Sequence, residues 1–317
     1  MAEKPAVPEK RAPRIVSFGE ALWDLLPEGR RLGGAPLNFA YRCTELGNEV
    51  FMISALGDDT LGREARERII GFGLDDRYIR TVPGVPTGTV EVYFDEFRNP
   101  DYTIIPNVAY DRITVTDELL ELVSGADALC FGTLAQRSET SRRCLEELIG
   151  AFRGRHLLLD LNLRKECYTE AIVRTSIDRA DILKLNEEEA AYLLGIFGLG
   201  APAPAETEQS GGKETAALRL AEEIKEAGNL DYCVVTLGPR GAVVAWADGG
   251  EYVPGHAVEL ADPLGAGDAF TAGFLTALLE DVDPGKAAER GNRLGSIVAG
   301  LPGATEPVPP EFLSLCR

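Results

Sequence analysis

The segment Asp262-Pro-Leu-Gly-Ala-Gly-Asp268-Ala-Phe carries the strongest chemical signal in this 317-residue chain. Its small residues let the backbone turn sharply, and an apolar run that predicts a helix follows directly. The free amides of Gly265, Ala266 and Gly267 would lie at the N-terminus of that helix, which attracts anions. The carboxylate of Asp268 could then accept a hydroxyl proton while the amides stabilise a moving phosphoryl group. The segment alone leaves open whether Asp268 only caps the helix.

Two other phosphate-binding motifs do not fit the sequence. Phe270 stands where a dinucleotide-binding fingerprint would need Gly or Ala after the two glycines. Gly-Lys-Ser or Gly-Lys-Thr, which a P-loop requires, occurs nowhere in the chain. The sequence therefore indicates neither a dinucleotide-binding turn nor a P-loop.

A second polar cluster, Gly-Gly-Ala-Pro-Leu-Asn38, lies about 230 residues earlier. The double glycine permits close approach of the backbone, and the proline suits an early helical position. With Asp24 upstream, Asn38 offers the donors and acceptors that are needed to bind sugar hydroxyls. In isolation, the cluster could also be an ordinary glycine-rich turn.

The elements that must position these residues follow an alternating pattern. Short apolar runs predict buried strands at Ile15–Phe18, Val50–Ala55, Ala128–Gly132, Leu157–Asp160, Ile182–Leu185 and Tyr232–Leu237. Helical patterns lie at 37–46, 61–72, 138–152, 187–194 and 216–227. This alternation predicts an α/β fold with a mostly parallel sheet covered on both faces, and ligands bind beyond the carboxyl ends of such strands.

One segment breaks the alternation of strands and helices. Thr87–Phe94 alternates with period two and Asp101–Ile105 follows a polar turn, which predicts an antiparallel hairpin. Together with residues 22–32 it would form a small sheet outside the main layer, as a lid or a dimer contact. Residues 198–212 are rich in Gly, Pro and Ala and predict a flexible surface insertion between two helices.

Composition narrows the class of protein. The net charge is -19, from 32 Lys+Arg against 51 Asp+Glu, which argues against nucleic acid and anionic membranes as partners. No apolar stretch approaches the 18 residues that a membrane span needs. The six scattered cysteines predict free thiols in the reducing cytoplasm. Residues 1–13 lack a targeting signal and predict a disordered leader.

Taken together, the two clusters resemble the paired signatures of the ribokinase-type (PfkB) carbohydrate kinase family, from about residue 14 to 305. Three runs are most similar to its fructokinase branch: Gly-Glu-Ala-Leu-Trp-Asp24, Asp160-x-Asn162-x-Arg164, and Pro-Thr-Gly-Thr-Val-Glu-Val at 86–92. The resemblance implies a ribokinase-like three-layer α/β/α kinase domain over 14–317, with a β lid at about 21–33 and 86–112. It also implies transfer of the γ-phosphoryl group of ATP, with Mg²⁺, to the 6-hydroxyl of D-fructose.

The family pattern also implies site residues. The implied catalytic residues are Asp268 as the base and Arg164 as a cation near the transferred phosphate. The implied anion hole consists of Gly265, Ala266 and Gly267. The sugar contacts implied are Asp24, Gly34, Asn38, Tyr102, Asp111, Gln136 and Asp268. The nucleotide contacts implied are Asn186, Thr236, Gly238, Gly241, Gly265, Gly267 and Asn292. Glu189, which ends an Asn-x-x-Glu motif, is implied to organise Mg²⁺ through water.

The chain departs from the family pattern at two places. Asp262-Pro263-Leu264 replaces the usual Asp-Thr-Thr, so the monovalent-cation (K⁺) site that the resemblance implies at Asp262 lacks a threonine hydroxyl. Cys167-Tyr168 replaces a usual Leu-Trp, which leaves 2-keto-3-deoxygluconate, other sugars and nucleosides open as acceptors.

A catalytically silent, sugar-binding regulator is the alternative from another class of function. The lid strand predicts a homodimer through the lid, because an exposed strand edge favours pairing.

Overall fold

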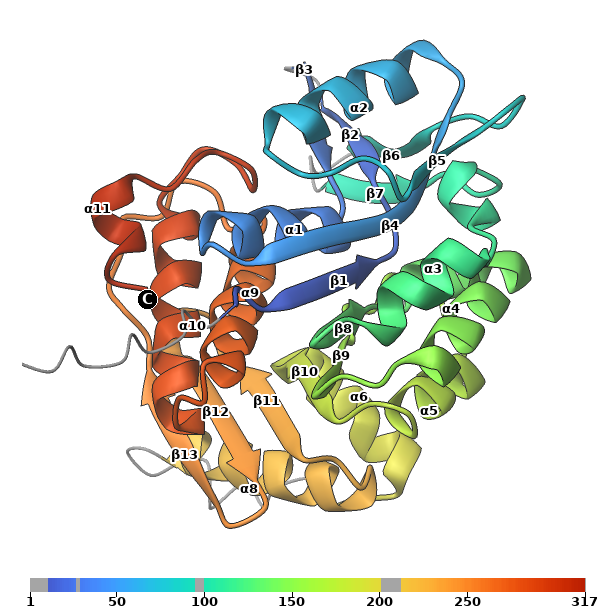
Figure 1. Cartoon of the computed structure of the whole chain (residues 1–317). Coiled ribbons are helices and arrows are strands. Elements are labelled where there is room, and N and C mark those ends of the chain that lie inside the picture. The colour runs from blue at the N-terminus through green and yellow to red at the C-terminus, as the bar shows by residue number, and fades with distance from the viewer. Residues whose placement is uncertain (1–10, 27–28, 95–99, 201–211, 317) are drawn as a thin grey trace, which may run out of the picture.

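The computed structural model describes residues 11–26, 29–94, 100–200 and 212–316 (Figure 1). The predicted leader lies outside the described residues up to position 10, and the predicted insertion lies outside them from 201 to 211. The described chain makes its first contact at Arg11, whose Nη2 lies 3.0 Å from Asp127 Oδ2.

Nine strands form the central sheet, in the order β13-β12-β11-β10-β9-β8-β1-β4-β5. Their bounds are β1 Arg14–Phe18, β4 Glu49–Gly57, β5 Ile79–Val82, β8 Ala128–Phe131, β9 His156–Asp160, β10 Ile182–Asn186, β11 Tyr232–Thr236, β12 Gly241–Trp246 and β13 Gly249–Pro254. The neighbours from β11 to β5 pair in parallel, whereas β12 and β13 add an antiparallel edge. The predicted mostly parallel sheet is confirmed, and its antiparallel edge is an addition to the prediction.

Helices cover both faces of this sheet (Figure 1). Their bounds are α1 Ala35–Glu45, α2 Thr60–Gly71, α3 Asp117–Ser124, α4 Glu139–Ala151, α5 Glu170–Ile177, α6 Glu187–Phe197, α8 Gly212–Ala227, α9 Ala266–Leu279, α10 Pro284–Ala299 and α11 Pro310–Leu313. One core lies under α3, α4, α5, α6 and α8, and the other under α1, α2, α9 and α10. Alternate residues of β1 supply both cores, because successive side chains of a strand point to opposite faces. No helix in the described ranges is long and apolar enough to cross a membrane.

A second sheet of four strands, in the order β3-β2-β6-β7, lies beside α2 and apart from the central sheet (Figure 1). Its strands are β2 Leu22–Leu26, β3 Gly29–Gly33, β6 Gly88–Phe94 and β7 Pro100–Ile104. β6 and β7 pair antiparallel, so the predicted hairpin is confirmed. Because β2 follows β1 after three residues and β3 leads directly into α1, this sheet borders the carboxyl edge of the central strands.

Candidate functional site

The glycine-rich turn stands at the start of α9, as the sequence predicts. Gly265 is the N-cap with φ 79°, and a Cβ there would lie 2.5 Å from the Cβ of Ala304. Only glycine fits this left-handed, crowded position. Within the described chain, the amides of Gly267 and Asp268 donate no hydrogen bond, whereas that of Ala266 is bonded inside the turn at 3.3 Å. The turn therefore keeps open N–H groups that can bind an anion.

Asp268 is the third residue of α9, and its carboxylate does not cap the helix. Its Oδ2 instead accepts a hydrogen bond of 2.8 Å from Asn38 Nδ2. Burial raises the pKa of Asp268 to about 6, and the charge of Asp160 adds to the rise. The hydrogen bond from Asn38 and the nearby cations oppose it. Above that pH the carboxylate is ionised and can accept a proton.

Asn38 is held in place by a crowded start of α1. Gly34 has φ 112°, and a Cβ there would lie 2.6 Å from the carbonyl oxygen of Glu20. A Cβ on Gly33 would lie 3.2 Å from Asp24 Oδ2 and 3.9 Å from Asn38 Oδ1, so these two oxygens converge. Asn38 Oδ1 is buried and has no partner among the described residues. Since buried polar atoms are almost always hydrogen-bonded, this oxygen indicates a place for a ligand donor.

The positive charge of Arg164, an exposed residue of the loop after β9, acts on three carboxyl groups of the site. Burial raises the pKa of Glu20 to about 7 and that of Asp24 to about 6. The positive charge of Arg164 lowers the pKa of Glu20, Asp24 and Asp268 alike, so its side chain lies near all three. Sequence reasoning missed Glu20, although it stands in the Gly-Glu-Ala-Leu-Trp-Asp run.

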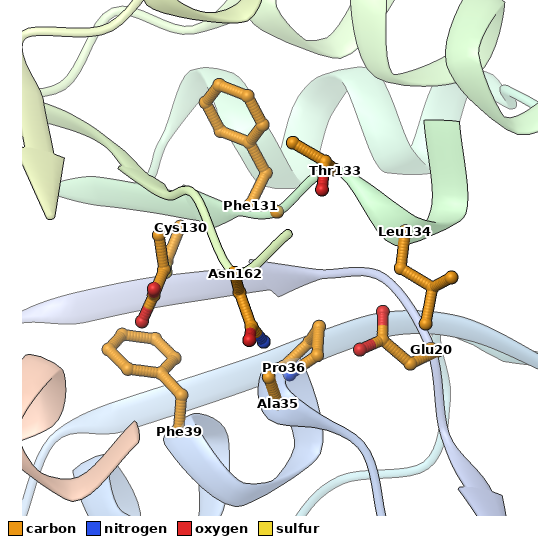
Figure 2. A pocket seen from close by; sticks show the side chains of 11 residues that line it. Glu20, Ala35, Pro36, Phe39, Cys130, Phe131, Thr133, Leu134 and Asn162 are labelled. Atoms are coloured by element: carbon orange, nitrogen blue, oxygen red, sulfur yellow. The ribbon is translucent and has the colours of Figure 1, made fainter. Parts of the chain in front are cut away.

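A small cavity opens between the end of β8 and the start of α1 (Figure 2). It is lined by Glu20, Ala35, Pro36, Phe39, Cys130, Phe131, Gly132, Thr133, Leu134, Asp160 and Asn162. In Figure 2 the side chains of Glu20, Pro36 and Asn162 lie close together at the start of α1. The cavity thus lies next to the helix that carries Asn38, at the carboxyl edge of the sheet.

Asn186 and Glu189 form a reciprocal cap at the start of α6. Asn186 Oδ1 accepts from the amide of Glu189 at 2.9 Å, and Glu189 Oε2 accepts from the amide of Asn186 at 2.9 Å. Glu189 Oε1 accepts from the amide of Leu163 at 2.7 Å, so this buried carboxylate also holds the loop that carries Arg164. Each carboxylate oxygen retains a lone pair, which fits contact with Mg²⁺ through water.

The predicted nucleotide loop lies at the end of β11. Thr236 is the last residue of that strand, and Gly238 has φ 60° in the 3-10 turn Gly238–Arg240. A Cβ on Gly241 would lie 2.1 Å from a carbonyl oxygen of β13, so this glycine is sterically required. Asn292 Nδ2 donates to the carbonyls of β13 at 3.0 and 3.3 Å. The side-chain amide of Asn292 therefore ties α10 to the sheet.

Two of the predicted sugar contacts are hydrogen-bonded to neighbouring elements. Gln136, in the 3-10 helix η2 (Leu134–Arg137), donates to Ser176 Oγ at 3.0 Å and lines a different cavity between α4 and α5. Asp111 Oδ1 lies 2.9 Å from Arg137 Nε in a buried ion pair. Both side chains bind neighbouring elements, and their roles as sugar contacts stay predictions. Tyr102 lies on β7, and its side chain is outside the described part of the chain.

Asp262 is engaged by a residue that the sequence did not single out. Its Oδ2 lies 2.8 Å from Arg31 Nη1, and its Oδ1 accepts from the amide of Leu264 at 3.0 Å. Arg31 belongs to β3 of the smaller sheet. The guanidinium of Arg31 thus pairs with the carboxylate that a monovalent cation would need as a ligand.

Comparison with known proteins gives a consistent match over most of the chain. The model of the pfkB family carbohydrate kinase matches residues 28–311. Fructokinase-1 of Zea mays is 28% identical over 326 residues, which cover 94% of this chain and 95% of that protein. The 2-dehydro-3-deoxygluconokinase of Thermoproteus tenax is 27% identical over 293 residues, which cover 88% and 83%.

A solved structure shows the same architecture. The fructokinase of Vibrio cholerae O395, in a form with fructose, ADP and calcium ion bound, has a TM-score of 0.76 and 25% identity over 96% of this chain and 98% of that chain. A double mutant of the same enzyme holds fructose, ADP and a potassium ion. The predicted ribokinase-like fold is therefore confirmed.

Proposed function

Because the chain belongs to the pfkB family of carbohydrate kinases, we propose that it transfers the γ-phosphoryl group of ATP to the 6-hydroxyl of D-fructose, with Asp268 as the base. The observation that carries this proposal is the 2.8 Å hydrogen bond between Asn38 and Asp268. It joins the sugar-binding cluster to the anion-binding turn across the fold. The fructokinases among the relatives support fructose as the acceptor.

In this mechanism the chain acts by positioning and electrostatics. Asp24 and the unpartnered Oδ1 of Asn38 would accept hydrogen bonds from sugar hydroxyls. Asp268 would take the proton of the attacking hydroxyl. The amides at the start of α9 and the guanidinium of Arg164 would stabilise charge on the phosphoryl group. Glu189 would hold Mg²⁺ through water, and the ion would supply positive charge against the phosphates.

The choice of acceptor is tested by ADP release. We expect little release without sugar, and the highest kcat/KM with D-fructose in a panel that includes 2-keto-3-deoxygluconate, ribose and a nucleoside. The kcat/KM for D-fructose should exceed that for the other acceptors by about tenfold or more. A site built for hydroxyl groups rejects analogues that leave its polar atoms unpaired. A preference for 2-keto-3-deoxygluconate would change the proposed acceptor but leave the proposed kinase activity intact. Absence of turnover with every acceptor would favour the silent regulator.

We expect turnover not to depend on K⁺. Arg31 already neutralises Asp262, and Leu264 supplies no hydroxyl ligand. Exchange of KCl for NaCl should change kcat/KM by less than about twofold, or about 0.4 kcal/mol of barrier. Arg31→Gln frees the carboxylate but restores no hydroxyl ligand, so this variant should gain only a weak K⁺ dependence. Strong K⁺ activation of the unaltered enzyme would contradict the expectation.

Two further parts of the proposal concern the whole molecule. The smaller sheet ends in the edge strands β3 and β7, which supports a homodimer through this lid. All six cysteines are free and buried, which supports action in the reducing cytoplasm.

A further inference from the structure

A buried lysine lies directly behind the anion-binding turn. Lys184, on β10, has its Nζ 3.1 and 3.2 Å from the two carboxylate oxygens of Asp160. The same Nζ lies 3.2 Å from the position that a Cβ on Gly267 would occupy. The ammonium group thus fills the space that the absent side chain of Gly267 leaves open.

Asp160 connects this lysine to the turn through a second contact. Its Oδ2 accepts a hydrogen bond of 2.8 Å from Thr271 Oγ1. Thr271 lies one turn further along α9, and the same Oγ1 lies 3.0 Å from the carbonyl oxygen of Gly267, so the two acceptors share its single hydrogen. Lys184, Asp160 and Thr271 form what we call the rear network of the turn, and all three are buried. Asp160 also lines the cavity at the start of α1.

Stability alone does not account for a charged pair at this position. Removing two charges from water costs several kcal/mol per ion, and apolar replacements of buried pairs are commonly neutral or stabilising. The pair is placed where phosphate charge would gather, under the open amides of the turn. A fixed cation in a water-poor site stabilises such charge far more strongly than a solvated one.

We propose that Lys184 is a positioning residue for phosphoryl transfer, which holds the Gly267 turn from behind and supplies positive charge to it, while Asp160 limits that charge by pairing. The inference rests on the proposed function, because the turn must bind a phosphoryl group for this charge to matter. Lys184 acts through Gly267 and Asp160 and takes no part in the proton transfer.

The network also acts on Asp268, in two opposite directions. Asp160 raises the pKa of Asp268, and Lys184 lowers it. The other groups that face this carboxyl are Asn38 on α1 and Arg164 after β9, which lower its pKa, and the carboxyl of Glu20, whose own pKa Asp268 raises. Loss of Lys184 should therefore raise the pKa of Asp268, and loss of the Asp160 charge should lower it.

The test uses Lys184→Met, Asp160→Asn and the double variant in the full-length protein. Lys184→Met should lower kcat by about tenfold or more with little change in the KM for sugar. The acidic limb of the profile of kcat against pH should move to higher pH in Lys184→Met and to lower pH in Asp160→Asn. The double variant should return the limb toward its original position, yet keep the low kcat, because the cation is still missing.

Arg14→Met is the matched control, because it removes a cation that pairs with Glu49 at the start of β1, remote from the turn. It should leave kcat and the pH profile unchanged. If Lys184→Met fails to fold, Asp160→Asn, which keeps the shape of the side chain, still decides the direction of the shift. The inference would be overturned if both single variants were less stable but kept the acidic limb of the unaltered protein. That result would show that the network is purely structural.

A readout without turnover separates this inference from the proposed function. The carboxyl carbon of Asp268 can be titrated by NMR in ¹³C-aspartate-labelled protein and assigned with Asp268→Asn. Opposite shifts of its pKa in the two single variants support the electrostatic part, even if no acceptor is phosphorylated. An unshifted titration overturns that part, even in an active kinase.

Discussion

Asp268→Asn should reduce kcat by about 10²–10⁴-fold, the range that a positioned general base contributes. The amide keeps the shape of the side chain and can still bond to Asn38, but it cannot accept the hydroxyl proton. ATP and sugar should bind nearly as before, since the turn amides and Asp24 are unchanged. Steady-state kinetics together with calorimetric titration of both ligands would measure the two effects separately.

Unfolding is not expected to cause this loss. Because the folded pKa of Asp268 is raised to about 6 from 3.8, ionisation of the carboxyl opposes folding above the unfolded pKa. A neutral Asn removes that cost, so thermal stability at pH 8 should be equal or higher.

Asp283→Asn is a suitable control, because Asp283 caps α10 through the amides of Gly285 and Lys286. This change should affect stability slightly and activity not at all. Near-normal kcat in Asp268→Asn would show that another group is the base.

Asn38→Asp is the second change with a large expected effect. It replaces the donor 2.8 Å from Asp268 with a second carboxylate. Two carboxylates that share a site cannot both ionise readily, so the pKa of Asp268 should rise from about 6 by roughly two units. Activity requires the ionised form, so the acidic limb should move to higher pH. The variant should be nearly inactive at pH 6 and regain activity toward pH 9.

A profile of kcat/KM from pH 5 to 9.5 tests this expectation. Asn38→Leu is the matched control, because it removes the same hydrogen bond without adding charge. Its main effect should be a raised KM for sugar, with a smaller movement of the limb. An Asn38→Asp profile that coincides with the original one would show that the two side chains do not meet during catalysis.

Much of the fold follows from local patterns in the chain. The six predicted parallel strands and the lid hairpin are present, because apolar runs and period-two alternation depend only on neighbouring residues. The antiparallel edge escaped prediction although β12 is an apolar run like the predicted strands. Its partner β13 gives a weak signal, because it begins with two glycines and buries only Val253. Helix α10 escaped because it is rich in glycine, which has low helix propensity. Its Gly291 is needed for contact with α9, since a Cβ there would lie 2.9 Å from Phe270.

Local sequence was enough to place Asp268 and its glycines at a helix N-terminus, which favours anions because its backbone N–H groups have no partner within the helix. The tertiary structure decided which groups meet that carboxylate. Asn38 reaches it from 230 residues away, and Lys184 lies behind its turn. It also paired Gln136 with Ser176 and Arg31 with Asp262. Such contacts depend on how distant elements pack and on which way each side chain points, and no local pattern encodes either.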